Sequence, residues 1–596
     1  IMDINSKLEA IRSKMKINGI DAYIIGTADP HQSEYPPSFW AGRQWISGFD
    51  GSAGTVIISQ DHAGLWTDSR YFQQAELQLA NTPFVLHKLQ VQTQSEYIDW
   101  ICNEFKDGQT VGVDFWCFSL NQIHQFDKLL STKGLKFKDC GDLLMDIWPD
   151  RPPLSKTLIY EHDIKYAGQT RKEKIDLVRE EMARLNANIS IVSALDEIGY
   201  ILNLRGNDVH CNPVFVAYLV IQKENSILFI DEQKLEPWLK NQLSEDRIFT
   251  QDYKQIVDYI TKLDLKQKVL IDHSTLNAKL TLMLAKDSLI PSESCIMRFK
   301  SIKNEIEISH IRRVMQKDGV ALLKSFRWLE AKLSEQDYPT EYQFAMKIKE
   351  FRAEQEGYVN ESFDAIIGYK GNGSIIHYRP EKDNCEIIKP EGVLLCDSGG
   401  QYLDGTTDIT RTIALGPIDE EIKIQNTAVL MGHISLARLI FPTDTKGIQF
   451  DILARQHLWQ LGLNYNHGTG HGVGFFMNVH EPPQGFVSVW NQRGSASFKA
   501  GMLTSNEPGY YQVGSYGIRI ENLVLTIPHS KNEYGEFLQF ESVSLFPIDV
   551  NMIHLPMLDK VSLQWLNTYH AKVLNDLSPW LNSDERKWLE EKCKPL

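Results

Sequence analysis

The chain has 596 residues, of which 42% are hydrophobic and 23% charged, so it is an ordinary globular sequence too long for one core. We therefore expect two to four domains. A formal net charge of −15 argues against nucleic acid or an anionic membrane surface as a main partner. No apolar run approaches the roughly 18 residues of a membrane span. The eight scattered cysteines lack a CxxC pair, which indicates a reduced, cytoplasmic protein rather than a disulfide framework.

The first 150 residues alternate between helix and strand patterns. Residues 6–18 place apolar side chains on one helical face, which predicts an amphipathic helix rather than a secretory signal. The apolar stretch 21–27 predicts a strand, and further strands separated by glycine-rich turns follow. This alternation predicts an α/β domain over residues 1–151, ending at the proline cluster 150–154.

The second segment repeats the first. The helical pattern KLEAIRSKM (7–15) matches KIDLVREEM (174–182), and the strands AYII and ISIV follow them. A glycine-containing turn and another strand come next in both copies. Duplication explains this matched order of four elements better than chance similarity between two helix–strand units does. Residues 152–298 are therefore predicted to be a second copy of the first domain.

The third segment, residues 299–596, opens near Arg298 with a long helix whose apolar residues recur at helical spacing. Gly319 is the one weak point of that pattern. Glycine and strand signals alternate after a second helix. The chain returns to helix at its end, where Ser583 is a candidate N-cap.

Two aspartates in DSGGQYLDGTTDITRT, Asp397 and Asp408, are candidate metal ligands. Each belongs to a predicted strand, and a hairpin brings its two strands within about 5 Å, so both carboxylates can bind one ion. The alternative, a solvated turn aspartate, suits Asp404 in the turn itself. It does not suit Asp397 or Asp408, because one closes an apolar strand and the other lies among β-branched residues. Cys396 is interpreted as a buried core thiol.

More candidate ligands follow downstream. His471 lies between glycines in HGTGHGVG, Glu507 lies in NEPGYY, and Glu521 shares a strand face with Arg519 in GIRIEN. A phosphate loop or a half-exposed strand are the alternatives, but the two histidines and the missing lysine make HGTGHGVG a poor phosphate loop. Four carboxylates and one imidazole suit Mn²⁺ or Co²⁺ better than a structural Zn²⁺ site. Because four carboxylates over-charge one dication, two ions with bridging carboxylates are expected.

Together these motifs resemble the metal-binding segments of the aminopeptidase P family, in the creatinase/methionine aminopeptidase superfamily. GFDGSAGT, LWTDSRYF, LRGNDV and SFDAIIGY…IIHYRP resemble its long three-domain form, so the resemblance covers essentially the whole chain. It implies an α/β (α+β) fold class, with two tandem creatinase-like N-terminal α/β domains followed by a C-terminal pita-bread catalytic domain. The implied activity is metal-dependent removal of the N-terminal residue from peptides with proline in second position. Short Xaa-Pro peptides are the implied partners, and a homodimer is the expected assembly.

The resemblance also implies how the metal ions are bound. Two divalent ions, usually Mn²⁺ with Zn²⁺ or Co²⁺ as alternatives, would share Asp408 and Glu521 as bridging ligands. Asp397 would chelate one ion, and His471 with Glu507 would complete the other. The ions lower the pKa of a shared water. Glu507 is the candidate catalytic residue that takes its proton and passes one to the leaving proline nitrogen.

Three histidines have implied roles in substrate binding and catalysis. His377 in IIHYRP or His480 in NVHE would stabilise the oxyanion, and His467 would line the pocket for the proline ring. Arg519 and Tyr511 would orient the ligand carboxylates.

Four other functions remain as alternatives. Prolidase shares the ligand set but cleaves dipeptides and is usually shorter, so the duplicated N-terminal half disfavours it. Methionine aminopeptidase is disfavoured by the roughly 300 residues that precede the predicted catalytic domain here. A non-enzymatic binding module or a metal-independent creatinase would not retain all five ligands.

Overall fold

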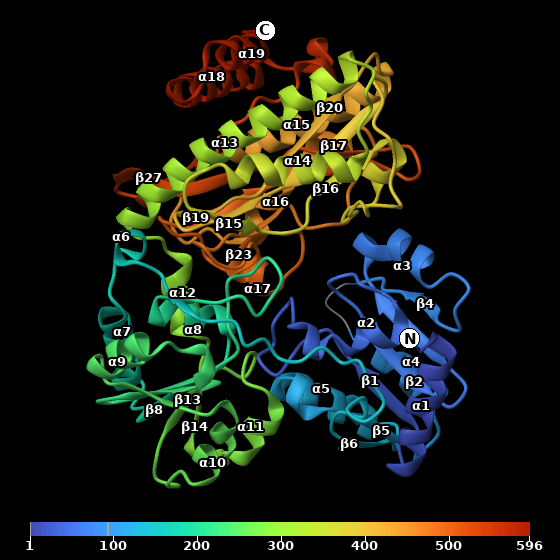
Figure 1. Ribbon diagram of the computed structural model, residues 1–596, viewed down its shortest axis with the longest axis vertical. Helices are drawn as coiled ribbons and strands as arrows, with labels where there is room; N and C mark the ends of the chain where they lie inside the picture. Colours follow the sequence, from blue (N-terminus) through green and yellow to red (C-terminus); the bar gives the residue numbers. More distant parts are fainter. Residues whose placement is uncertain (1, 92–94) are drawn as a thin grey trace. The chain divides into compact units, whose positions relative to one another are not determined.

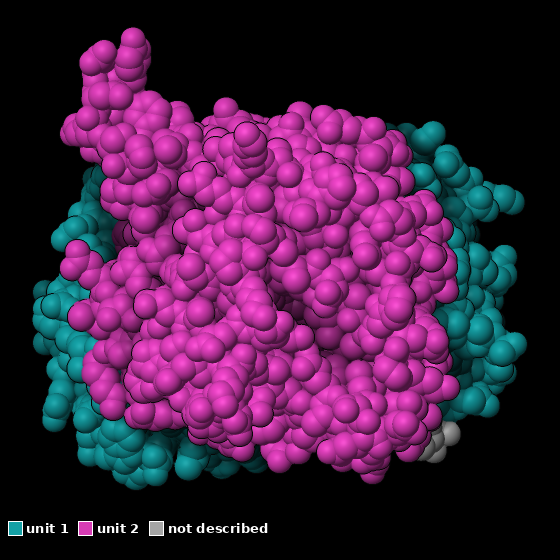
Figure 2. Space-filling model, turned by 90° about the horizontal axis from the view of Figure 1, so that it is seen from above, with its two compact units in different colours: residues 1–164, 169–296 teal, residues 165–168, 297–596 magenta. Residues whose placement is uncertain are grey.

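The protein is described by a computed structural model that covers residues 2–91 and 95–596. It divides into two compact units, residues 1–164 with 169–296 and residues 165–168 with 297–596, which are coloured separately in Figure 2. The division into three domains at residues 151/152 and 298/299, expected from the sequence, stays a prediction. Within the described part of the chain, no helix combines the length and apolar character that crossing a bilayer requires.

Unit 1 contains two six-stranded sheets built in the same way. Their strand orders are β4-β3-β2-β1-β5-β6 and β12-β11-β10-β8-β13-β14. In both sheets one strand (β1 or β8) pairs antiparallel with one neighbour (β2 or β10) and parallel with the other (β5 or β13). The predicted duplication is confirmed by this shared topology.

The elements of unit 1 are short, as is usual for an α/β unit. Its strands are β1 Ala22–Ile25, β2 Thr55–Ser59, β3 Ala63–Thr67, β4 Val85–Lys88, β5 Thr110–Val113, β6 Lys136–Asp139, β7 Tyr160–Glu161, β8 Ile189–Val192, β9 Leu204–Arg205, β10 Tyr218–Gln222, β11 Ser226–Phe229, β12 Ile248–Gln251, β13 Val269–Ile271 and β14 Leu289–Pro291. Its longer helices are α1 Ile4–Ile17, α2 Gly42–Ser47, α3 Phe72–Gln78, α4 Glu96–Glu104, α5 Leu120–Ser131, α7 Arg171–Arg184, α8 Leu195–Leu202, α9 Pro237–Glu245, α10 Ile256–Thr261 and α11 Ala278–Met283.

Both faces of the first sheet are buried. Ile24 and Ile57 belong to one apolar cluster, whereas Tyr23 and Val56 belong to another. Because successive side chains of a strand point to opposite faces, these clusters lie on the two sides of the sheet. Such two-sided burial explains why the strands are continuous apolar runs rather than alternating ones.

Unit 2 combines antiparallel sheets with long helices. A six-stranded sheet has the order β21-β28-β27-β24-β22-β23, and two three-stranded sheets have the orders β16-β17-β20 and β15-β18-β19. Helix α14 packs on β16 and on α13, and α15 packs on α16 (Figure 1). One large apolar core lies between these layers. The strands that carry the candidate ligands are therefore held between packed helices.

The helices of unit 2 include the longest of the described chain. They are α13 Glu305–Ser334, α14 Glu341–Ala353, α15 Glu420–Ala437, α16 Gly447–Gln460, α17 Gln492–Ser495, α18 Lys560–Leu577 and α19 Ser583–Lys592, preceded by the short α6 Ile164–Ala167 and α12 Cys295–Ser301. The strands are β15 Tyr358–Glu361, β16 Ile366–Tyr369, β17 Val393–Ser398, β18 Gly400–Tyr402, β19 Gly405–Thr406, β20 Ile409–Ala414, β21 Ile440–Pro442, β22 Gly470–Gly472, β23 Glu481–Phe486, β24 Leu503–Asn506, β25 Gly509–Gln512, β26 Tyr516–Arg519, β27 Asn522–Asn532 and β28 Gly535–Ser542.

Two helix starts differ from the sequence expectation. The long helix does not begin near Arg298, because α12 ends at Ser301 and Asn304 caps the separate helix α13 through a capping box. At the C-terminus, Asn582 rather than Ser583 is the N-cap of α19. In both cases an asparagine and the glutamate three residues later form a capping box, which sets the start of the helix.

Candidate metal centre

The five predicted ligands come from strands of unit 2 or from residues beside them. Asp397 lies on β17, and Asp408 immediately precedes β20. His471 lies on β22. Glu507 immediately follows β24, and Glu521 immediately precedes β27. β17 pairs antiparallel with β20, so the expected hairpin between the two aspartates is present.

The glycines around His471 are required by close backbone contact. A Cβ on Gly470 would lie 1.8 Å from the carbonyl oxygen of Ser505, so no larger residue fits there. The backbone N–H of His471 donates to Ser505 Oγ at 2.9 Å. β22 thus packs closely against Ser505 of β24, and this contact fixes the direction of the His471 imidazole.

Four predicted ligands converge. Asp408, His471, Glu507 and Glu521 each offer a ligand atom, and these atoms all lie within 4.8 Å of one another. His471 Nε2 is 3.5 Å from Asp408 Oδ2 and 3.5 Å from Glu507 Oε2. His471 Nδ1 lies 2.9 Å from the carbonyl oxygen of Gly472, which can only accept, so the proton of the neutral ring resides on Nδ1. The Nε2 lone pair therefore faces carboxylate oxygens, an arrangement that a cation between them would stabilise.

Asp397 is attached to the same cluster through its neighbours. Arg519 Nη2 donates to Asp397 Oδ2 at 2.7 Å, and Arg519 Nε donates to the same oxygen at 3.2 Å. Opposite Asp397 in the β17–β20 register is Thr410, whose hydroxyl donates to Glu521 Oε2 at 2.7 Å. One guanidinium and one hydroxyl therefore orient two of the predicted ligands.

The buried carboxylates of this cluster would be stabilised by bound cations. Burial raises the pKa of Asp397 to about 6, with Glu521 adding to the effect, and burial raises the pKa of Asp408 and Glu521 well above the ordinary values. Burial lowers the pKa of His471 to about 3. Asp397 Oδ1 and Glu521 Oε1 are buried and have no hydrogen-bond partner in residues 2–91 and 95–596. Buried carboxylate oxygens without hydrogen-bond partners, next to a neutral imidazole, are suitable ligands for divalent metal ions.

Two of the three predicted substrate histidines contact site residues. His480 stacks edge-on against His471, with ring centroids 4.3 Å apart. His467 Nε2 lies 2.8 Å from the hydroxyl of Tyr511, which accepts a hydrogen bond from Arg519 Nη1 at 2.8 Å. Burial raises the pKa of Tyr511 to about 12, so the phenol keeps its proton. Arg519 and Tyr511 thus connect His467 to Asp397.

His377 lies in the segment between β16 and β17. The carbonyl oxygen of the preceding residue, Ile376, is 3.5 Å from Arg519 Nη2. This contact brings the backbone beside His377 to the guanidinium that binds Asp397.

Thr410 and Thr412 belong to the site but were not among the residues predicted from the sequence. Thr412 Oγ1 donates to the carbonyl oxygen of Arg519 at 2.8 Å, and Thr410 contacts Glu521 as described. With Asp408 they occupy every second position of TTDITRT. The period of two was the signal that could have identified them.

The interpretation of Asp404 as a solvated turn residue was wrong. Asp404 is buried, and its Oδ2 accepts a hydrogen bond from Lys317 Nζ at 2.8 Å. This lysine lies on α13, 87 residues earlier in the chain. Cys396, by contrast, is a buried free thiol in the apolar core, as expected.

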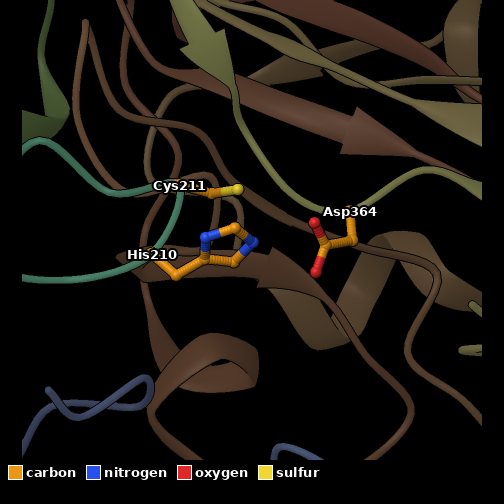
Figure 3. Close-up of side chains that lie close together, drawn as sticks. All are labelled: His210, Cys211 and Asp364. Carbon is orange, nitrogen blue, oxygen red and sulfur yellow. The ribbon is translucent and has the colours of Figure 1, made fainter. Parts of the chain in front are cut away.

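Another set of side chains of ligand type is shown in Figure 3. His210 and Cys211 are consecutive residues of one loop in unit 1, whereas Asp364 belongs to unit 2. Because they come from separate units, we do not assign them a common site.

Comparisons with known proteins cover the full chain. The profile of metallopeptidase family M24 matches residues 309–527, and its C-terminal region matches residues 536–596. Creatinase/prolidase N-terminal domain profiles match residues 7–147 and 150–307, so unit 1 and the pita-bread unit have the predicted fold class.

Full-length relatives are similar throughout. A probable Xaa-Pro aminopeptidase P of Laccaria bicolor is 39% identical over 100% of this chain and 94% of its own, and Xaa-Pro aminopeptidase 1 of Dictyostelium discoideum is 38% identical over 100% and 97%. The crystal structure of X-prolyl aminopeptidase from Caenorhabditis elegans, described as a cytosolic enzyme with a di-nuclear active site, superposes with a TM-score of 0.96 at 32% identity and covers 100% of both chains. The chain belongs to the Xaa-Pro aminopeptidase P family of M24 metallopeptidases.

Proposed function

We propose that this chain hydrolyses the bond between the N-terminal residue and proline in peptides that carry proline in second position. The observation that carries this proposal is the buried convergence of Asp408, His471, Glu507 and Glu521. Full-length similarity to Xaa-Pro aminopeptidases supports it independently. Prolidase activity on dipeptides is the second candidate to be tested, because it shares the ligand set.

Two divalent metal ions are the cofactors. Asp408 and Glu521 would bridge them, Asp397 would bind one, and His471 with Glu507 would bind the other. Mn²⁺ is our preferred metal because carboxylate oxygens dominate the set, with Co²⁺ or Zn²⁺ as alternatives. When bound, the ions supply Lewis acidity and an acidified water.

Glu507 is our candidate for proton transfer. Burial raises the pKa of Glu507, which makes this carboxylate a better base than an exposed glutamate. It would take a proton from the attacking water and deliver one to the proline nitrogen. A proline nitrogen is a poor leaving group without that proton.

The histidines act on the substrate. His480 or His377 would donate a hydrogen bond to the carbonyl oxygen as negative charge develops on it. His467, held by Tyr511, would line the pocket for the proline ring. We further propose that the protein works as a cytoplasmic homodimer. The cytosolic relative with a TM-score of 0.96 supports the compartment.

The test is cleavage of Arg-Pro-Pro by the purified protein, before and after EDTA and after adding back Mn²⁺. We expect metal-dependent release of free arginine, and much slower cleavage of the dipeptide Arg-Pro. No release with any divalent ion would reject the proposed function. Faster cleavage of the dipeptide would replace it with prolidase activity.

The role of Glu507 in proton transfer is tested with a separate variant. Glu507→Gln should keep the fold and lower kcat at least 100-fold, whereas Glu533→Gln, on an exposed turn between β27 and β28, should leave kcat unchanged. Near-normal turnover by Glu507→Gln would show that another group moves the proton.

A further inference from the structure

The segment that carries His377 has little regular structure of its own. Between Ser374 and Val393 the chain forms no helix and no ladder strand, only isolated bridges. Backbone hydrogen bonds hold it near its second half, from Glu341 N–H to the carbonyl oxygen of Glu386 at 2.9 Å and from Ile388 N–H to that of Pro339 at 2.8 Å, and side chains of other elements hold it elsewhere. A histidine that acts on a substrate atom requires such fixing, because a displacement of about 1 Å costs roughly 100-fold in rate.

A single carboxylate binds this segment at several points. Glu341, the first residue of α14, has 0% of its surface exposed. It accepts hydrogen bonds from the N–H of Tyr369 at 2.7 Å, the N–H of Glu386 at 2.7 Å, Asn372 Nδ2 at 3.0 Å and the hydroxyl of Tyr378 at 2.8 Å. Two donors precede the segment, Tyr378 lies near its start beside His377, and Glu386 lies in its second half. Glu341 and these donors are called the clasp below.

The residues on either side of His377 are each tied to a charged group. Ile376 contacts Arg519, which also binds Asp397, and Tyr378 donates to Glu341. The backbone of His377 is therefore held between the candidate metal centre on one side and the N-terminus of α14 on the other. A buried carboxylate is well suited to this position, because the helix N-terminus stabilises its charge.

We propose that Glu341 and Tyr378 are positioning residues for His377. This inference rests on the proposed function, in which His377 contacts the substrate. Tyr378→Phe removes the hydrogen bond that this hydroxyl donates to Glu341 and the one that it accepts from Asn372 Nδ2 at 3.2 Å, and it leaves the other donors to Glu341 in place. Glu341→Gln is more disruptive, because its amide group would face backbone N–H donors.

Steady-state kinetics on Arg-Pro-Pro with Mn²⁺ test the proposal through a double-mutant cycle. We expect Tyr378→Phe to lower kcat about 10-fold and to change KM less than about 3-fold. His377→Asn should also lower kcat, and the double variant should be no slower than His377→Asn alone. A double variant slowed by the full product of the two factors would overturn the proposal, as would unchanged kcat in His377→Asn.

A matched control and a second readout separate this inference from the proposed activity. Tyr369→Phe also removes one phenol but keeps the N–H that donates to Glu341. Its hydroxyl donates to the carbonyl oxygens of Glu391 at 2.8 Å and Lys389 at 3.3 Å, at the far end of the segment from His377, so kcat should stay near normal. Hydrogen exchange at residues 375–379 should be faster in Tyr378→Phe than in Tyr369→Phe, whether or not the protein cleaves peptides. Equal exchange in the two variants would show that the clasp does not hold the segment, even if the unmodified protein is active.

Discussion

The phenol of Tyr511 donates a hydrogen bond to His467 Nε2 at 2.8 Å. His467 Nδ1 is 2.8 Å from the carbonyl oxygen of Gly468, so in the neutral ring the proton lies on Nδ1 and Nε2 accepts. The hydroxyl of Tyr511 in turn accepts from Arg519. A chain of hydrogen bonds, directed away from Arg519 on both sides, thus links the carboxylate of Asp397 to the imidazole of His467.

Breaking this chain at Tyr511 should impair turnover without emptying the metal site. We expect Tyr511→Phe to lower kcat/KM about 10-fold, the effect of losing one hydrogen bond to a charged group of about 1.5 kcal/mol. Metal content, measured by atomic emission, should be unchanged. Tyr510→Phe is the control, since its phenol bonds Gln512 at the surface. Equal losses in the two variants would contradict the directed chain.

The residue after His480 forms a buried cluster with two cations. Glu481 is 0% exposed; Lys300 Nζ contacts its Oε2 at 2.7 Å and Lys303 Nζ contacts its Oε1. Removing the carboxylate leaves two buried ammonium groups together, whereas removing Lys303 leaves one balanced pair. We therefore expect Glu481→Gln to destabilise the fold by about 3–5 kcal/mol, and Lys303→Met by clearly less.

Urea unfolding of these two variants provides the measurement, with Lys332→Met as the control for an exposed pair, expected to change stability by about 0–1 kcal/mol. The reverse order, with Lys303→Met the less stable variant, would mean that other groups balance the lysines.

Gly319 should not tolerate alanine, although alanine is the better helix former. A Cβ there would lie 2.4 Å from the carbonyl oxygen of Leu545 and 3.0 Å from Leu577 Cδ2. We expect Gly319→Ala to destabilise the protein by about 1–3 kcal/mol, because overpacking outweighs the propensity gain of about 1 kcal/mol. Thermal unfolding checks this. Ser309→Ala, on an exposed position of the same helix, should be neutral or slightly stabilising; a higher melting temperature in Gly319→Ala would contradict the contact.

Acid should destabilise unit 2 through His570. This side chain is buried and its Nε2 accepts the N–H of Ile548 at 3.0 Å; burial, with a smaller effect of Arg411, lowers its pKa to about 4 from 6.5. The unfolded chain takes up a proton below pH 6.5 and the folded chain does not. Stability present above pH 6.5 is therefore lost as the pH falls towards 4, by about 3 kcal/mol in full.

The measurement is urea unfolding at pH 7, 6, 5 and 4. His570→Gln retains an acceptor for Ile548 but does not titrate, so its stability should fall less steeply between pH 6.5 and 4. Parallel curves for the two proteins would exclude His570 as a source of the acid sensitivity.

The sequence was most informative where the reason for a residue is local. Duplicated strands at 22–25 and 189–192 and the glycine beside His471 could be interpreted from neighbouring residues, because strand burial and close backbone contact leave their mark on adjacent positions. The partners of buried charges could not. Lys317 lies 87 residues before Asp404, and Lys303 lies 178 residues before Glu481. Only tertiary packing brings these pairs together, so Asp404 was interpreted as a solvated turn residue, and the sequence did not single out Glu341 or Glu481.

Because β17 pairs with β20, the length of the turn that joins them determines where the proposed ligand Asp408 lies. Asp397 faces Thr410 in a fixed register, and Asp408 and Thr410 share a face only because they are two residues apart. Deleting one residue between Tyr402 and Thr407 would change no proposed ligand, yet it would shift this register and turn the Asp408 carboxylate away from His471. The length of this turn is therefore constrained by the ligand geometry, in addition to the constraint that the contact with Lys317 places on Asp404.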